Sequence, residues 1–65
     1  MLSPKERQVA DRFAMIFSEG DSLEDIRSDL QSLPLQLEYL VEINGRWLVA
    51  VRVGSVRLID NRVGE

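Results

Sequence analysis

Apolar residues in the first part of the chain recur at helical spacing. Steps of three and four residues place side chains on one face of a helix. Ser3 is suited to cap this helix and Pro4 to occupy its first turn, while Gly20 is expected to end it in a left-handed conformation. The apolar stripe that this helix would bury consists of Val9, Phe13, Ile16 and Phe17.

A second stripe follows directly and predicts a second, shorter helix. Asp21 and Glu24 have the spacing of a capping box at its start. Pro34 disfavours helical geometry at the residue before it and therefore closes the segment. The stripe consists of Leu23, Ile26, Leu30 and Leu33.

The second half of the chain is typical of strands, because Val, Ile, Trp and Tyr dominate it. Residues 35–43, 46–53 and 56–59 form three such runs, separated by Asn44-Gly45 and Gly54-Ser55. Turn residues between short β-rich runs predict hairpins. The sequence therefore predicts a three-stranded antiparallel meander.

The register of the first hairpin depends on the length of its loop. A two-residue loop at Asn44-Gly45, with strict alternation, would place the apolar residues of 35–43 beside Arg46 and Arg52. A three-residue loop, 43–45, with Gly45 in a left-handed bulge position, separates core from solvent, and we predict this register. The core face would then hold Leu37, Tyr39, Val41, Trp47, Val49, Val51, Val53, Val56 and Leu58.

Neither layer can bury its apolar side alone. The two N-terminal helices are therefore expected to pack on one face of the three-stranded meander. The predicted fold class is α+β, in a single small domain of residues 1–65.

The same register predicts the composition of the outer face of the sheet. Leu40 opposite Leu48, and Ala50 opposite Ile59, would form an apolar centre. Arginines and glutamates would surround it, and an apolar centre with a charged rim is typical of a binding surface. Scattered exposed apolar residues without a function are the alternative interpretation. The predicted contact residues are Glu38, Leu40, Glu42, Arg46, Leu48, Ala50, Arg52, Arg57 and Ile59.

Composition narrows the candidate chemistry. The chain has 65 residues, a net charge of −3, one lysine, and neither cysteine nor histidine. Disulfides are excluded, and the usual zinc ligands, neutral-pH base and thiol nucleophile are missing. The sequence therefore predicts a protein that is not an enzyme and that uses no cofactor and no metal.

An acidic column is expected on the second helix. Asp21, Asp25 and Asp29 follow one another at four-residue steps. A straight helix does not converge these oxygens on a cation, so the column is interpreted as a secondary contact for a basic partner and not as a metal site.

A winged helix is the alternative fold. Residues 35–43 also accept a helical interpretation, which would give three helices and one hairpin. Leu2–Val9 and Ser22–Ile26 resemble the first two helices of LuxR-type helix-turn-helix domains, a resemblance that implies DNA binding. However, Leu35–Leu40, where a recognition helix would lie, contains no Arg or Lys to contact phosphates or guanine.

The function predicted from these observations is that of a small regulatory or adaptor protein. It would bind a protein partner, or a second copy of itself, through the outer face of the sheet. Nucleic acid is the less favoured partner and a membrane is not expected. The cytoplasm is the expected location, because no export signal or apolar span is found.

Overall fold

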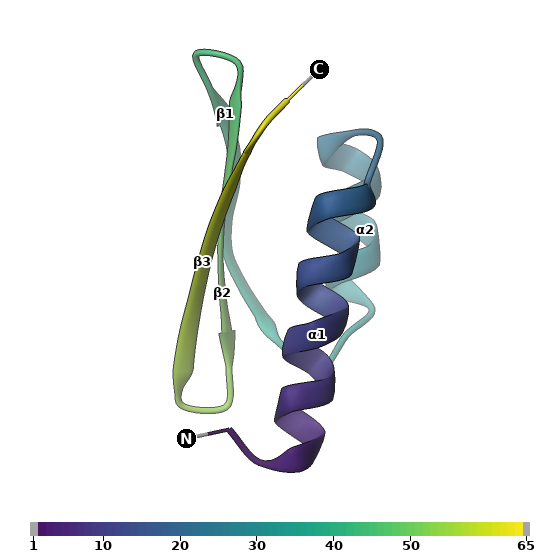
Figure 1. The fold of residues 1–65 in the computed structure, drawn as a ribbon, viewed down its shortest axis with the longest axis vertical. Coiled ribbons are helices and arrows are strands. Elements are labelled where there is room, and N and C mark those ends of the chain that lie inside the picture. Colours follow the sequence, from purple (N-terminus) through teal and green to yellow (C-terminus); the bar gives the residue numbers. More distant parts are fainter. Residues whose placement is uncertain (1, 65) are drawn as a thin grey trace.

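A computed structural model describes residues 2–64 of the chain. Two helices precede three strands that form one antiparallel sheet in the order β1-β2-β3. Figure 1 shows both helices on the same side of the sheet. The α+β prediction is confirmed. The elements are α1 (Pro4–Glu19), α2 (Leu23–Gln31), β1 (Gln36–Ile43), β2 (Arg46–Val53) and β3 (Val56–Val63).

Helix α1 begins as the sequence predicts and ends differently. The Ser3 hydroxyl accepts a hydrogen bond from the Glu6 amide at 3.2 Å, and the Glu6 carboxylate accepts one from the Ser3 amide at 2.9 Å. Gly20 is extended, with φ −67° and ψ 142°, so the left-handed ending is wrong. Glycine is needed there for space, because an added Cβ would overlap the side chain of Ile26.

Helix α2 begins one residue later than the capping-box pattern indicates. The N-cap is Ser22, whose hydroxyl accepts from the Asp25 amide at 3.1 Å. Asp21 therefore precedes the helix. The predicted column of three carboxylates is reduced to Asp25 and Asp29, which are exposed on α2.

The core lies between the two layers and, among residues 2–64, contains no buried polar or charged side chain. Phe13 and Phe17 of α1 and Ile26 and Leu30 of α2 pack against the sheet as their stripes predict. The sheet contributes Leu40, Trp47, Val49, Val51 and Val53.

The first hairpin has the register that the sequence analysis rejected. Asn44 and Gly45 form a two-residue turn with φ values of 52° and 78°, the left-handed pair that a type I′ turn requires. Ile43 pairs with Arg46 directly. The conflict between core and charge is resolved in the strand, because an irregularity between Leu37 and Tyr39 shifts the register by one residue at Glu38.

This bulge reverses the faces of the residues that follow it in β1. Leu37 still faces the core opposite Val51, but Leu40 also faces it, opposite Val49. Leu40 is only 3% exposed, whereas Tyr39 is 37% and Val41 40% exposed. The predicted places of Leu40, Tyr39 and Val41 were therefore wrong.

The remaining strands agree better with the prediction. Val53 pairs with Val56 across a tight Gly54-Ser55 turn, and Ala50 pairs with Ile59 as expected. Strand β3 continues to Val63, four residues beyond its predicted end. Because residues 36–43 are a strand, the winged-helix alternative is wrong. No helix within residues 2–64 has the length and apolar character needed to cross a membrane.

Candidate functional site on the outer face of the sheet

The outer face of the sheet, opposite the helices, is built from cross-strand rows. Each row takes one residue from each strand, so side chains of the same row are neighbours. The rows are Ile43–Arg46–Val63, Val41–Leu48–Asn61, Tyr39–Ala50–Ile59 and Gln36–Arg52–Arg57.

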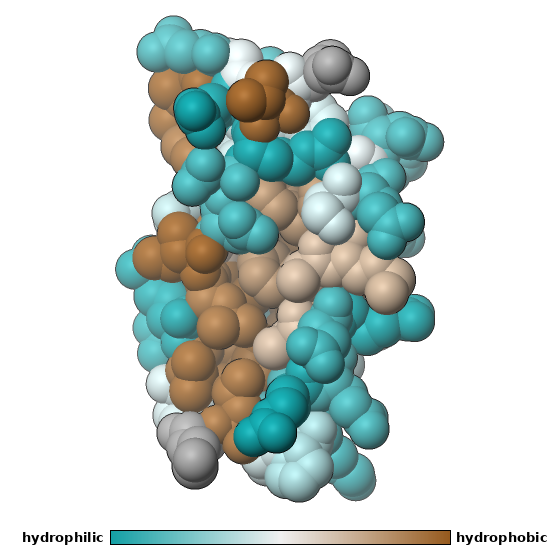
Figure 2. Space-filling model, in the orientation of Figure 1, coloured by the Kyte–Doolittle hydropathy of each residue, from teal (hydrophilic) through white to brown (hydrophobic). Residues whose placement is uncertain are grey.

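Six apolar side chains on this face form what we call the outer-face patch. Their exposed fractions are 37% for Tyr39, 40% for Val41, 53% for Ile43, 60% for Ile59 and 63% for Val63, while Leu48 is half-buried. Ala50 lies in the same surface but is fully buried beneath its neighbours. Figure 2 views the sheet along its edge; hydrophobic atoms lie over the sheet and its junction with the helices, with hydrophilic atoms among them, and hydrophilic atoms dominate over the helices.

The structure places most, but not all, of the predicted contact residues on this face. Arg46, Leu48, Ala50, Arg52, Arg57 and Ile59 lie there. Leu40 is in the core, and Glu42, exposed and paired with Trp47, lies on the helix side of the sheet.

Sequence reasoning missed four members of the outer-face patch: Tyr39, Val41, Ile43 and Val63. The Asn44-Gly45 dipeptide was the available signal, because it is the strongest short-range indicator of a two-residue hairpin turn. Accepting that turn would have placed Val41 and Ile43 on the outer face.

Glu38, the residue at the bulge, holds the two arginines that face each other on β2 and β3. Its Oε2 accepts from Arg52 Nε at 3.2 Å and Nη2 at 3.1 Å, and its Oε1 accepts from Arg57 Nε at 2.6 Å. The hydrogen bond from Arg57 is the main reason that the pKa of Glu38 is lowered, and the same bond raises the pKa of Arg57. The like charges of Arg52 and Arg57, which pair directly across β2 and β3, are thus compensated by one carboxylate.

Arg46, at the other end of the face, has a neutral partner. Its Nη1 donates to Asn61 Oδ1 at 3.1 Å. Within residues 2–64 no carboxylate lies within 4.0 Å of its guanidinium, since the ion pairs found there join only Glu38 to Arg52 and Arg57. The positive charge of Arg46 is therefore uncompensated by the described part of the chain.

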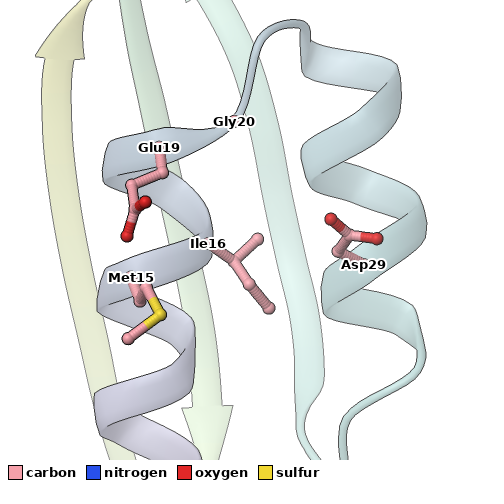
Figure 3. A pocket seen from close by; sticks show the side chains of 5 residues that line it. All are labelled: Met15, Ile16, Glu19, Gly20 and Asp29. Atoms are coloured by element: carbon pink, nitrogen blue, oxygen red, sulfur yellow. The ribbon is translucent and has the colours of Figure 1, made fainter.

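A groove of about 220 Å³ lies between the helices, on the other layer of the molecule. Met15, Ile16, Glu19 and Gly20 line it from α1 and its end, and Asp29 from α2 (Figure 3). Its two carboxylates, Glu19 and Asp29, belong to different helices. Within residues 2–64 no group of three or more His, Cys, Asp or Glu residues could hold a metal ion.

The chain is similar to one region, about a quarter of the length, of proteins that are named as ligases. No family model matches it. It is 43% identical to pantothenate synthetase of Legionella pneumophila (strain Corby) over 60 residues, which are 92% of this chain and 24% of that protein. It is 37% identical to pantothenate synthetase of Coxiella burnetii (strain Dugway 5J108-111), again over 92% of this chain and 23% of the relative.

A solved structure extends the similarity to the fold. The pantoate-beta-alanine ligase of Francisella tularensis, complexed with beta-gamma ATP and beta-alanine, superposes with a TM-score of 0.84 at 30% identity. The match covers 95% of this chain and 24% of that one. The chain thus spans about a quarter of the length of the proteins it matches.

These similarities correct the predicted function. The interpretation as a non-catalytic regulatory or adaptor protein is wrong, because the proteins that match 92% of the chain are named as an enzyme. The prediction failed because it required these 65 residues to contain every reactive group of an enzyme. A missing histidine or cysteine says nothing about an enzyme when only a quarter of that enzyme is compared.

Proposed function

We propose that this chain forms the helix–sheet domain of a pantoate–β-alanine ligase, a pantothenate synthetase. The observation that carries the proposal is the 43% identity to the Legionella protein over 92% of the chain. The superposition on the Francisella ligase supports it independently, because the order and packing of the elements agree over 95% of the chain.

The substrates we propose for the whole protein are pantoate, β-alanine and ATP. These follow from the names of the matched proteins and from the molecules in the Francisella complex. The cytoplasm, where ATP is available, is the location we propose.

Within such a ligase, three arginines of this domain have structural partners and are not free to act on the substrates. Phosphoryl and acyl transfer need cations or dipoles directed at the developing charge. Arg52 and Arg57 are already paired with Glu38, and Arg62 is committed to backbone carbonyls of α1.

A chimeric enzyme tests the proposal. This chain would replace the 60 matching residues of the Legionella enzyme, and pantothenate formation from pantoate, β-alanine and ATP would be measured. We expect a rate within about tenfold of the parent enzyme, since a matched domain preserves the geometry of the site. A chimera carrying Leu30→Asp, which places a charge in the core, serves as the control and should lose activity. A folded, monodisperse chimera that forms no pantothenate would refute the proposal.

A further inference from the structure

The outer-face patch has no cover within residues 2–64. Both helices lie on the opposite side of the sheet (Figure 1). We propose that the remainder of the ligase covers this patch, with an apolar surface that carries a carboxylate opposite Arg46. The inference rests on the proposed function and adds to it the surface through which this domain is held.

The composition of the patch indicates that it is a contact surface. An antiparallel sheet with one solvated face normally alternates apolar residues on the core side with polar residues on the water side. Here Val41, Ile43, Ile59 and Val63 are 40–63% exposed. Each of the three strands contributes apolar residues to the patch, and the row Tyr39–Ala50–Ile59 is apolar on all three. A continuous exposed apolar surface of this kind marks an interaction site more often than an incidental exposure.

The size of the face argues against a second copy of the chain as the occupant. Three strands of eight residues, at ~3.4 Å per residue and ~4.8 Å between strands, cover roughly 400 Å². A stable complex of separate proteins usually buries ~800 Å² on each partner. A smaller interface suffices between parts of one chain, because the covalent connection raises their effective concentration.

The matched proteins have further residues that could form the surface opposite the patch. About three quarters of their length lies outside the region that this chain matches. A domain of this size buries too little apolar surface to be very stable by itself. Packing the patch against the rest of the ligase would add burial where the domain lacks it.

Charge specifies the chemistry of the opposing surface. At one end of the face, Glu38 forms ion pairs with Arg52 and Arg57 and so compensates part of their positive charge. Arg46, at the other end, is exposed, and within residues 2–64 its guanidinium donates only to the neutral oxygen of Asn61. A carboxylate from the remainder of the ligase would complete this end as Glu38 completes the first, and would fix the orientation of the two parts.

Cysteine modification measures whether the patch is covered. The chain has no cysteine, so Ile59→Cys and Met15→Cys each introduce one thiol at positions that are 60% and 54% exposed. The substitutions would be made in the ligase that carries this chain. The rate of maleimide modification at each position, resolved by peptide mass spectrometry, would be divided by the rate in denatured protein.

Covering predicts at least about a tenfold lower rate at residue 59 in the native enzyme than in the denatured one. A rate at residue 59 close to the denatured value would overturn the inference. Protection that appears only as the enzyme concentration rises would also overturn it, because a second copy would then be the cover. Met15, outside the patch, reports whether protection is specific to the outer face.

Charge reversal tests the carboxylate. Arg46→Glu should raise the modification rate at residue 59 several-fold, and Arg12→Glu, on the exposed face of α1, should leave that rate unchanged. An unchanged rate with Arg46→Glu would contradict a carboxylate opposite this residue. Pantothenate formation by the unmodified chimera separates the two hypotheses: an active enzyme with an open patch refutes the docking alone, and an inactive folded one refutes the proposed function.

Discussion

Arg62 ends helix α1 from outside the helix. Its Nη1 donates to the carbonyl oxygens of Phe17 at 2.8 Å and of Ser18 and Gly20 at 3.1 Å. The last turn of α1 contains no basic residue, so this guanidinium supplies the positive charge that the carbonyl end of a helix favours. The same group lies 4.7 Å from the ring centroid of Trp47, and thereby joins β2, β3 and α1.

We expect Arg62→Ala to lower the free energy of unfolding by about 2 kcal/mol or more, because charge-assisted hydrogen bonds and a cation–π contact are lost together. Arg62→Lys should recover only part of this loss, since a compact ammonium group is more strongly hydrated than a guanidinium and cannot stack on the Trp47 ring as the planar group does. Urea unfolding followed by the fluorescence of Trp47, the chain's single tryptophan, measures both. Arg7→Ala, on the exposed side of α1, is the control, and an equal loss in that variant would contradict the role of Arg62.

Glu38 makes the outer face sensitive to acid. Its pKa is lowered in the folded protein, chiefly by the hydrogen bond from Arg57. A lowered folded pKa means that the stabilisation is complete above the unfolded value, ~4.3 for glutamate, and is lost as the pH falls through the folded pKa. The β1 bulge should therefore weaken only below the usual glutamate range.

Titration of the Glu38 carboxyl carbon by NMR measures this directly. Its midpoint should lie below that of an unperturbed glutamate. Arg57→Gln should raise the midpoint more than Arg52→Gln does, because the bond from Arg57 is the larger cause of the shift. A larger effect of Arg52→Gln would show that Arg52, and not Arg57, is the main cause of the lowered pKa of Glu38.

At the scale of elements, the β1 bulge determines which side chains reach the core. Arg27 of α2 also stabilises this register of β1, because its Nη2 donates a hydrogen bond to the Leu40 carbonyl oxygen at 3.1 Å. A one-residue slip would exchange every side chain between the faces. Packing against the helices therefore favours the register in which Leu40 lies in the core between the sheet and the helices.

Paired alanine variants distinguish the two registers. Leu40→Ala should lower the free energy of unfolding by ~2–5 kcal/mol, the usual cost of a cavity in a packed core. Val41→Ala, at an exposed position, should cost less than ~1 kcal/mol, the span of strand propensities. Chemical denaturation provides both values. The reverse order of costs would support the three-residue loop that the sequence alone favoured.

At the scale of the whole molecule, the two layers close one core and leave one sheet face open. The core contains no buried polar or charged side chain among residues 2–64, while the outer-face patch joins apolar side chains of all three strands. The apolar side chains of the open face contribute to the free energy of unfolding only when another surface removes them from water. If the remainder of the ligase covers this face, as we propose, the domain is more stable within the ligase than by itself.

Ile59→Thr in the chimeric ligase should lower the midpoint of thermal unfolding, because burial of about two apolar carbon atoms, worth ~1 kcal/mol, is lost. Threonine keeps the β-branched shape that the strand favours. Met15→Gln, a substitution of similar size on α1, should leave the midpoint unchanged. Differential scanning calorimetry measures both, and equal shifts would mean that residue 59 has no special place in the ligase.

The sequence by itself determined the elements of this protein. The Ser3 cap, the stripes through Phe13 and Ile26, and the turn residues between the strands act over a few positions, so their effects can be deduced without knowing the rest of the chain. The fold class followed, because amphipathic helices and an amphipathic sheet have few ways to bury their apolar sides.

Only the tertiary structure decided which face each residue of β1 occupies. The bulge at Glu38 is stabilised by arginines 14 and 19 residues away and by a core that α2 completes. Such contacts are not encoded in local alternation, so the exposed apolar surface was predicted with the correct β2 residues and the wrong β1 residues. For the same reason the partner proposed for that surface cannot be deduced from any pattern in these 65 residues, because the residues of both surfaces would specify the contact.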